Sequence, residues 1–256
     1  MHSEIACANG FVLSHTDFRE RDLILRIAVE GHGLCAFIAK GARGSRKRFG
    51  GALDVLVPSN LTFRKKDSGL GQLREAYRIS GPEPSASDIA AYGVRCYTAE
   101  YLLATVEENH PTGYPFKLMS WVYDALSDLS FSDKPKERAL WVLNRVRVIG
   151  LNREGRCPDL FRCSDCQVDF TKGSRVGFTR DRGIFCESCM HMSGDGFPMS
   201  FGHLLEFREL YQGGAFSGEW CSRELTDWLE SQIVEVLGRE LSSNRILKSL
   251  VPDRAV

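Results

Sequence analysis

Large apolar residues occupy every second position along residues 23–29 of the chain. The apolar set is Leu23, Leu25, Ile27 and Val29, and Asp22, Ile24, Arg26 and Ala28 stand between them. This period of two predicts a strand with one well-buried face. A glycine turn at 31–33 and an apolar run at 34–39 then predict that the strand is one arm of a hairpin.

Three further strands are predicted in the same region, at 11–13, 55–63 and 70–79. The last two are joined by a turn at Asp67-Ser68-Gly69. Five short antiparallel strands with long basic loops favour a small barrel such as the OB-fold. Residues 1–80 are therefore predicted to form an OB-fold nucleic-acid-binding domain.

The apolar spacing changes to three and four residues after Pro82 and Pro84. On the first predicted helix, which Ser87-Asp88 would cap, the core-facing stripe is Ile89, Tyr92, Cys96, Ala99, Leu103 and Val106. Similar stripes predict helices at 119–129, 140–146, 201–211 and 225–237. The predicted fold class is α+β multidomain, with an α-helical domain over 81–256 and a zinc-ribbon-like module inserted at about 157–192.

Two CxxC pairs are the most specific chemical motif in the chain. They are Cys163-Ser164-Asp165-Cys166 and, after nineteen residues, Cys186-Glu187-Ser188-Cys189. This spacing is typical of a tetrahedral zinc site, in which each pair supplies two sulfurs at about 2.3 Å from one ion. The predicted ligands of one structural Zn²⁺ are therefore Cys163, Cys166, Cys186 and Cys189.

The four thiolates would fill every position around the ion, so no activated water and no catalysis at the metal are expected. Two other interpretations stay open at this stage: four free cysteines in a reducing compartment, and a thioredoxin-like redox pair. Cys157 and His191 lie near the motif as less well placed candidates. Nine cysteines, an odd number, argue against a disulfide framework.

The composition is that of a globular protein, but its balanced charge hides an uneven distribution. The chain has 256 residues, with 33 Lys and Arg against 33 Asp and Glu. Residues 1–80 hold thirteen basic and eight acidic residues, so their net charge is +5 and that of the remainder is −5. No apolar run approaches the roughly 18–20 residues of a membrane span, and no signal peptide is visible, so a cytoplasmic protein is expected.

The positive charge of the predicted barrel falls into two clusters. The first basic cluster is Lys40, Arg43, Arg46, Lys47 and Arg48, and the second is Arg64, Lys65 and Lys66. Both are predicted to lie in barrel loops, where OB-folds hold oligonucleotides. Phe49 would offer a stacking face for a base. The alternative is a solvated loop with surplus charge.

These motifs favour nucleic-acid binding, dominated by phosphate contacts, over catalysis. The chain contains no G-x-x-x-x-G-K-[ST] phosphate loop, no G-x-S-x-G elbow and no H-E-x-x-H pair. We therefore expect no enzymatic activity.

Several motifs together resemble the RecO family of bacterial recombination and repair mediators. They are Gly10-Phe11-Val12-Leu13, Phe18-Arg19-Glu20-Arg21-Asp22, Lys40-Gly41-Ala42-Arg43, Arg48-Phe49-Gly50-Gly51-Ala52-Leu53, Gly69-Leu70-Gly71-Gln72-Leu73, and Cys157-Pro158-Asp159-Leu160 ahead of the four cysteines. The resemblance runs nearly end to end and is most specific at 39–53. Gln167 and Arg182 depart from it, because many relatives carry glycine there.

The resemblance implies an OB-fold, a helical domain and a structural zinc. It also implies binding of single- and double-stranded DNA, strand annealing, cooperation with RecR, and help in loading RecA onto DNA coated by single-stranded-DNA-binding protein (SSB). The helical domain would dock the acidic, aromatic-ended tail of SSB, with Arg208 or Arg147 as the basic residue. The alternatives are an RNA- or ribosome-associated zinc-ribbon protein and a cysteine-based redox enzyme.

Overall fold

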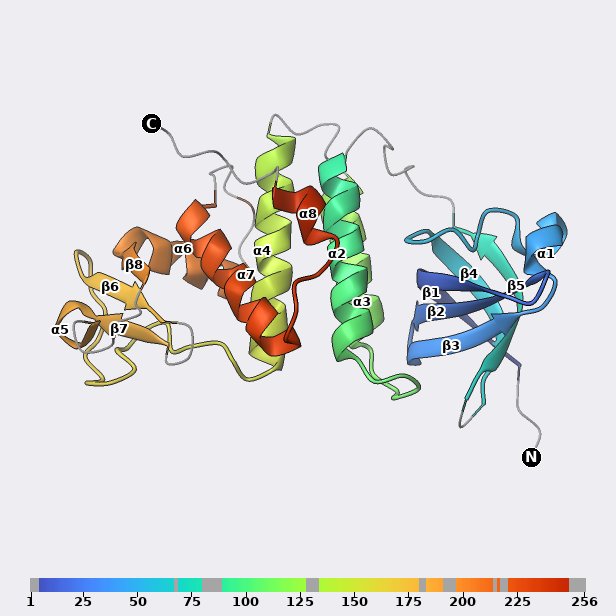
Figure 1. The fold of residues 1–256 in the computed structure, drawn as a ribbon, viewed down its shortest axis with the longest axis horizontal. Coiled ribbons are helices and arrows are strands. Elements are labelled where there is room, and N and C mark those ends of the chain that lie inside the picture. The colour runs from blue at the N-terminus through green and yellow to red at the C-terminus, as the bar shows by residue number, and fades with distance from the viewer. Residues whose placement is uncertain are drawn as a thin grey trace. The chain divides into compact units, whose positions relative to one another are not determined.

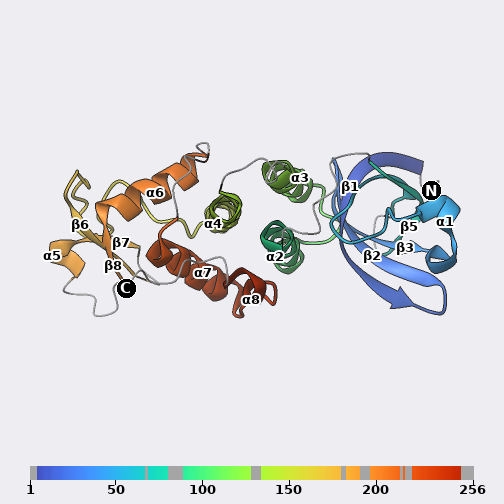
Figure 2. The same cartoon turned by 90° about the horizontal axis from the view of Figure 1, so that it is seen from above.

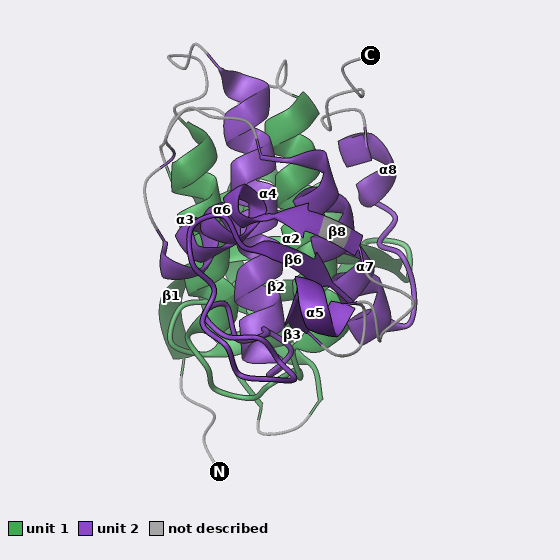
Figure 3. Cartoon of the chain, turned by 90° about the vertical axis from the view of Figure 1, so that its left-hand side faces the viewer, with its two compact units in different colours: residues 1–128 green, residues 129–256 purple. Residues whose placement is uncertain are grey.

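The computed structural model describes residues 5–66, 69–79, 89–127, 134–179, 183–190, 197–213, 216 and 221–248. The chain forms two compact units, residues 1–128 and 129–256 (Figure 3). The features predicted at Asp67-Ser68, Ser87-Asp88, Arg182 and His191 lie outside the described residues.

The first unit begins with a closed barrel of five strands. They are β1 (Ile5–Phe18), β2 (Asp22–Val29), β3 (Gly33–Ala39), β4 (Pro58–Arg64) and β5 (Gly71–Arg78). Their order is β1-β2-β3-β5-β4, and β4 pairs with β1 to close the barrel (Figure 1). Every pair is antiparallel except β3 with β5. The predicted five-stranded OB-type barrel is confirmed.

β1 pairs with two neighbours and carries a β-bulge. Residues 5–11 pair with β4, residues 10–18 pair with β2, and the register to β2 shifts between Val12 and Ser14. A bulge bends its strand and breaks the strict alternation of faces. Four consecutive residues of β1, Gly10 to Leu13, are buried next to this register shift.

The barrel encloses an apolar core. Its members include Val12, Leu25, Ile27, Val29, Phe37, Leu61, Phe63 and Leu73. Burial of each such large side chain contributes roughly 1.5–3 kcal/mol. After β3, a 3₁₀ turn η1 (Ala42–Gly44) and the short helix α1 (Arg46–Phe49) pack against the barrel and add Phe49 to this core.

Two helices cover the outside of the barrel near β1. They are α2 (Ile89–Thr105) and α3 (Tyr114–Ser127), which lie side by side (Figure 2). The ring of Phe11 on β1 lies 5.6 Å from that of Phe116 and 5.8 Å from that of Tyr123, both on α3. Around Phe11 and Val12, β1 is therefore buried on both faces.

The predicted core-facing stripe of α2 was wrong in part. Ile89 is 68% exposed and Tyr92 is 52% exposed, whereas Ala99 and Val106 are buried as predicted. The residues that pack instead include Ala90, Val94, Tyr97 and Tyr101, which have the same spacing of three and four. The helix is apolar on two faces, so periodicity alone could not choose between them.

The second unit combines helices with a small sheet. The helices are α4 (Pro135–Arg153), α6 (Phe201–Gln212), α7 (Arg223–Leu237) and α8 (Asn244–Leu247). The sheet has the order β7-β6-β8, with β6 (Arg175–Phe178), β7 (Ile184–Cys186) and β8 (Phe197–Ser200), and α5 (Glu187–Met190) follows β7 directly. Among the described residues, no helix has the length and apolar character needed to cross a membrane.

Candidate metal centre and basic barrel loops

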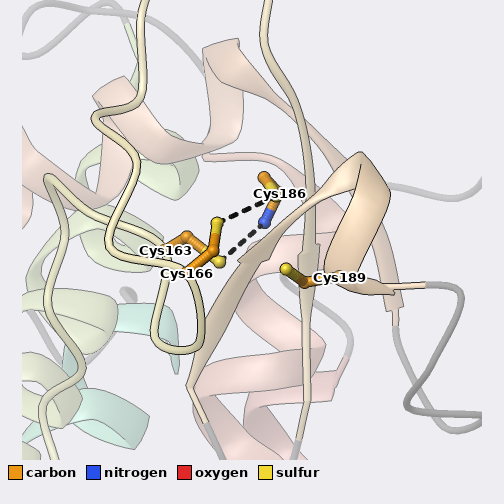
Figure 4. A group of neighbouring side chains, drawn as sticks. All are labelled: Cys163, Cys166, Cys186 and Cys189. Carbon is orange, nitrogen blue, oxygen red and sulfur yellow. Dashed lines mark hydrogen bonds between the residues drawn. The ribbon is translucent and has the colours of Figure 1, made fainter.

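The four predicted cysteine ligands meet at one point of the second unit. Cys163 and Cys166 lie on a turn, Cys186 ends β7, and Cys189 lies on α5 (Figure 4). All four Sγ atoms lie within 4.8 Å of one another. A tetrahedral ion with 2.3 Å bonds needs sulfurs about 3.8 Å apart, and Cys166 Sγ lies 3.7 Å from Cys186 Sγ. The cluster therefore fits a metal ion with four sulfur ligands.

The electrostatics of the cluster favour a thiolate at Cys163. Burial raises the pKa of this thiol, but hydrogen bonds from the backbone N–H groups of Cys186, Asp165 and Cys166 outweigh burial and lower the pKa to about 7. The Cys186 N–H lies 3.4 Å from Cys163 Sγ. Hydrogen bonding with Cys166 raises the pKa of Cys189. Repulsion between adjacent thiolates opposes the ionisation of all four thiols at once. A bound divalent cation compensates this negative charge.

Gln167 closes the first cysteine turn with a left-handed backbone, at φ +60°. Its backbone N–H and its side-chain amide both donate to the carbonyl of Cys163, each at 3.1 Å. The Cys163 N–H donates to the Val168 carbonyl at 2.9 Å. Glycine adopts this backbone conformation at no steric cost. The turn therefore forms with glutamine in place of glycine, and the glutamine side chain adds a hydrogen bond to the Cys163 carbonyl.

An aromatic cluster attaches the cysteine module to the helices of the second unit. The ring of Trp228 on α7 packs edge-on against that of Phe178 on β6, at 5.0 Å, and at a tilt against that of Phe207 on α6, at 5.6 Å. The Trp228 indole N–H donates to the Thr179 carbonyl at 3.1 Å. All three rings are buried, so this hydrogen bond and these contacts form in a nearly dry environment. Loss of order in the cysteine module would therefore disturb the packing of α6 and α7.

Among the described residues, Cys157 is not part of the cluster formed by the four CxxC cysteines. Burial raises the pKa of its thiol to about 11. A thiol with a raised pKa is seldom ionised near neutral pH and is therefore a poor nucleophile unless a metal binds it. Cys157 is thus close to the CxxC motif in the sequence but does not contribute a sulfur to the cluster.

The first basic cluster lies on η1, α1 and the residues next to them. Lys40, Arg43, Arg46 and Lys47 are exposed, and Arg43 forms an ion pair with Asp17 at 3.0 Å. The Arg48 guanidinium is half-buried and bonds within the loop, donating to the Lys40 carbonyl at 2.8 Å and to Ser45 Oγ at 3.1 Å. Four side chains are thus presented to solvent, while Arg48 also holds the loop in shape.

Phe49 does not present a stacking face, contrary to the prediction. Its side chain is 3% exposed and belongs to the barrel core. The Arg48 guanidinium lies 4.8 Å from the ring centroid. The four-residue helix α1 turns the aromatic ring inward and the basic side chains outward, as expected for an amphipathic segment at a barrel end.

The second basic cluster lies where β4 ends. Arg64 is the last residue of β4, and Lys65 and Lys66 follow it. In Figure 1, α1 lies at one edge of the barrel and the connection from β4 to β5 leaves the opposite edge. The two clusters therefore occupy separate loops of one barrel, before and after β4.

The two arginines considered for a docking site in the helical unit differ sharply. Arg147 is 2% exposed and is bound to groups inside the unit, so the interpretation of this residue as a peptide-docking residue is wrong. Arg208 is half-buried and lies 4.5 Å from the ring of Phe161 and 5.6 Å from that of Phe201. Its guanidinium donates to the Leu160 carbonyl at 2.7 and 3.0 Å.

The fold and the site define a class of protein: an OB-type barrel with basic loops, combined with a helical unit built around a four-cysteine module. The family model described as "Recombination protein O N terminal" matches residues 1–81, and "Recombination protein O C terminal" matches residues 86–245. The chain belongs to the RecO family, as its sequence motifs predicted.

Curated relatives cover nearly the whole chain. The protein from Desulfatibacillum aliphaticivorans is 29% identical over 253 residues, which are 94% of this chain and 96% of the relative. That from Anaeromyxobacter sp. (strain K) is 26% identical over 252 residues, 95% and 96% of the two chains. That from Pelobacter propionicus is 29% identical over 207 residues, 80% and 79%. All three are named DNA repair protein RecO.

Proposed function

We propose that this protein acts in DNA repair as a mediator without enzymatic activity. It binds single- and double-stranded DNA, anneals complementary strands and, with RecR, assists the loading of RecA onto SSB-coated single strands. Membership of the RecO family supports this role. The observation that carries it is the pair of basic clusters in the loops before and after β4.

Annealing requires only that the repulsion between two phosphate backbones is reduced. The exposed side chains of Lys40, Arg43, Arg46, Lys47 and Lys66 place positive charge at two edges of the barrel. Each neutralised phosphate releases counterions, so affinity falls steeply as salt rises. Two separate clusters allow one barrel to contact two backbones, or two stretches of one strand. No bond is made or broken, and no catalytic residue is required.

The metal in the second unit is proposed to be one structural Zn²⁺ held by Cys163, Cys166, Cys186 and Cys189. Soft thiolate donors and a tetrahedral arrangement suit zinc, and a site with four protein ligands has no open position for a substrate. When bound, the ion ties the turn at 163–166 to β7 and α5. The protein is proposed to act in the cytoplasm, where thiols stay reduced and able to bind metal.

The acidic, aromatic-ended tail of SSB is proposed to dock beside Arg208. The neighbouring Phe161 side chain is 53% exposed and supplies an apolar contact next to the cation. Replacing Arg208 with Ala should weaken binding of a tail peptide, measured by fluorescence anisotropy, while DNA affinity stays unchanged. Equal affinity of the two proteins for the peptide would place the tail elsewhere.

The proposed function is tested by annealing of complementary DNA strands, bare and coated with SSB. Rapid annealing of coated strands that slows as salt rises is the expected result. Complementary RNA strands run in parallel serve as the comparison. Strong RNA binding without DNA annealing would overturn the mediator proposal in favour of an RNA- or ribosome-associated protein.

A further inference from the structure

A small cavity opens on the barrel surface beside the first basic cluster. It has a volume of about 210 Å³, and its lining includes His15, Leu23, Ala42, Arg43, Arg46 and Phe49. All of these residues belong to the first unit. Pockets for drug-sized ligands measure roughly 300–1,000 Å³, so the occupant of this cavity is smaller than such a ligand.

The lining combines apolar walls with a basic rim. Leu23, Ala42 and Phe49 contribute apolar surface, and the exposed Arg43 and Arg46 contribute cations. Asp54 also lines the cavity, and its negative charge would repel a phosphate placed inside. The apolar walls suit an uncharged planar group inside the cavity. The two arginines at the rim suit phosphates outside it.

The cavity is held open by hydrogen bonds of the loop that forms its rim. The Gly41 N–H donates to Asp22 Oδ1 at 2.8 Å, and the Arg43 N–H donates to the Arg21 carbonyl at 3.2 Å. The two bonds from Arg48 to Lys40 and Ser45 brace the same loop. A site formed before its ligand arrives loses less entropy on binding.

We propose that this cavity accepts one unstacked base of single-stranded DNA while Arg43 and Arg46 hold the flanking phosphates. An imidazole ring, such as that of His15, is a surface on which unstacked bases pack. A base in a duplex must leave its stack to reach such a pocket, which costs a few kcal/mol. This inference rests on the proposed DNA binding and adds to it a preference of the barrel for single strands.

The test fills the cavity without changing charge. Ala42→Met lengthens a lining side chain, and Gly44→Ala is the matched control, because a Cβ at Gly44 meets nothing within 4 Å. The probes are a single-stranded oligonucleotide, an abasic oligonucleotide of the same length and a duplex. Stacking of one base is worth at least about 1 kcal/mol. The wild-type protein should therefore bind the intact strand about fivefold or more tighter than the abasic strand.

We expect Ala42→Met to bind the intact and the abasic strand equally well. Its affinities for the abasic strand and the duplex should be those of the wild type. Gly44→Ala should behave as the wild type with all three probes. Equal binding of intact and abasic strands by the wild type, or full discrimination by Ala42→Met, would overturn the inference and leave DNA binding intact. Failure of the wild type to bind any probe would instead overturn the proposed function.

A second measurement does not depend on any variant. Photo-crosslinking of the wild-type protein to a strand that contains 5-iodouracil, followed by peptide mapping, should label His15 or residues 42–54. Crosslinks confined to other parts of the chain would contradict the base-binding cavity.

Discussion

Arg147 and Glu230 form an ion pair inside the second unit, with Arg147 Nη2 2.5 Å from Glu230 Oε2. Their side chains are 2% and 15% exposed. The Arg147 guanidinium also donates to Asn144 Oδ1 at 2.9 Å and to Asn244 Oδ1 at 3.2 Å. This network joins α4, α7 and α8. Arg147, which the sequence analysis considered for peptide binding, therefore holds three helices together.

Replacing Arg147 with Met should destabilise the second unit strongly. Removal of one partner of a buried pair leaves the other charge uncompensated, at a cost of roughly 3–5 kcal/mol. The free energy of unfolding in urea measures the loss. Lys136→Met is the control on the same helix, because Lys136 is exposed and its replacement should change stability by no more than about 0.5 kcal/mol. A loss below 1 kcal/mol for Arg147→Met would show that the pair does not hold the helices.

The features that were predicted correctly are those encoded locally. Alternation at 22–29 indicated β2, and the spacing within each CxxC pair identified the four sulfurs that meet. A strand and a cysteine knuckle need only neighbouring residues to be recognised. The register of β1, with its bulge between Val12 and Ser14, depends on two different partner strands and had no local pattern.

The features that were missed depend on distant partners. Asn244, a partner of Arg147, is 97 residues away along the chain, and no spacing rule connects the two. Phe49 lies in a glycine- and arginine-rich segment typical of a solvated loop, yet the barrel core takes up its ring. On α2, the apolar residues that face outward could be separated from those that face inward only by the packing of β1 and α3.

The pH dependence of stability should contain a contribution from Glu206. Burial raises the pKa of this carboxyl, although it accepts hydrogen bonds from Ser222 N–H at 3.0 Å and Ser222 Oγ at 2.7 Å. A folded state with a raised pKa binds the proton more tightly than the unfolded state, so stability falls as pH rises from the ordinary value of 4.5 through the folded pKa.

Glu206→Gln should remove this contribution, because an amide does not titrate. The stability of the variant relative to wild type should therefore rise with pH across that range. Urea unfolding of both proteins at a series of pH values measures the difference, and the other carboxyl groups cancel in it. A difference that is flat or that falls with pH would contradict the prediction.

The left-handed turn at Gln167 predicts that two substitutions at this position differ in their effect on stability. Gln167→Gly should stay within about 1 kcal/mol of wild type, because relief of the strain is offset by the lost side-chain bond to Cys163 and by the entropy of glycine. Gln167→Val should cost about 1–3 kcal/mol, because a β-branched residue tolerates positive φ poorly. Thermal unfolding of the metal-loaded proteins tests both, and equal melting temperatures for the two variants would count against the turn geometry.

Removal of the metal should weaken the second unit. Binding energy at a structural zinc site is also folding energy, because the unfolded chain has no preformed site. Replacing both Cys163 and Cys186 with Ser should abolish stoichiometric zinc and lower the melting temperature, and a strong chelator should do the same to the wild type. Cys7→Ser, at an exposed thiol outside the cluster, is the control. Unchanged metal content in the double variant would reject these cysteines as ligands.

The first basic cluster should set part of the salt dependence of DNA binding. Each phosphate contact adds about 0.7 to the slope of log affinity against log salt for single strands, so replacing Arg43, Arg46 and Lys47 with Ala should reduce the slope by up to about 2. Arg48 is kept, because its bonds to Lys40 and Ser45 hold the loop.

A control with the same change in net charge separates contact from general electrostatics. Replacing the exposed Arg153, Lys172 and Arg239 of the second unit with Ala removes three positive charges far along the chain from the loop. Fluorescence anisotropy at several salt concentrations should show a reduced slope for the loop variant and a smaller change for the control, because the slope counts the phosphates that the protein contacts and not its net charge. If both triple variants reduced the slope equally, net charge and not the barrel loop would govern binding.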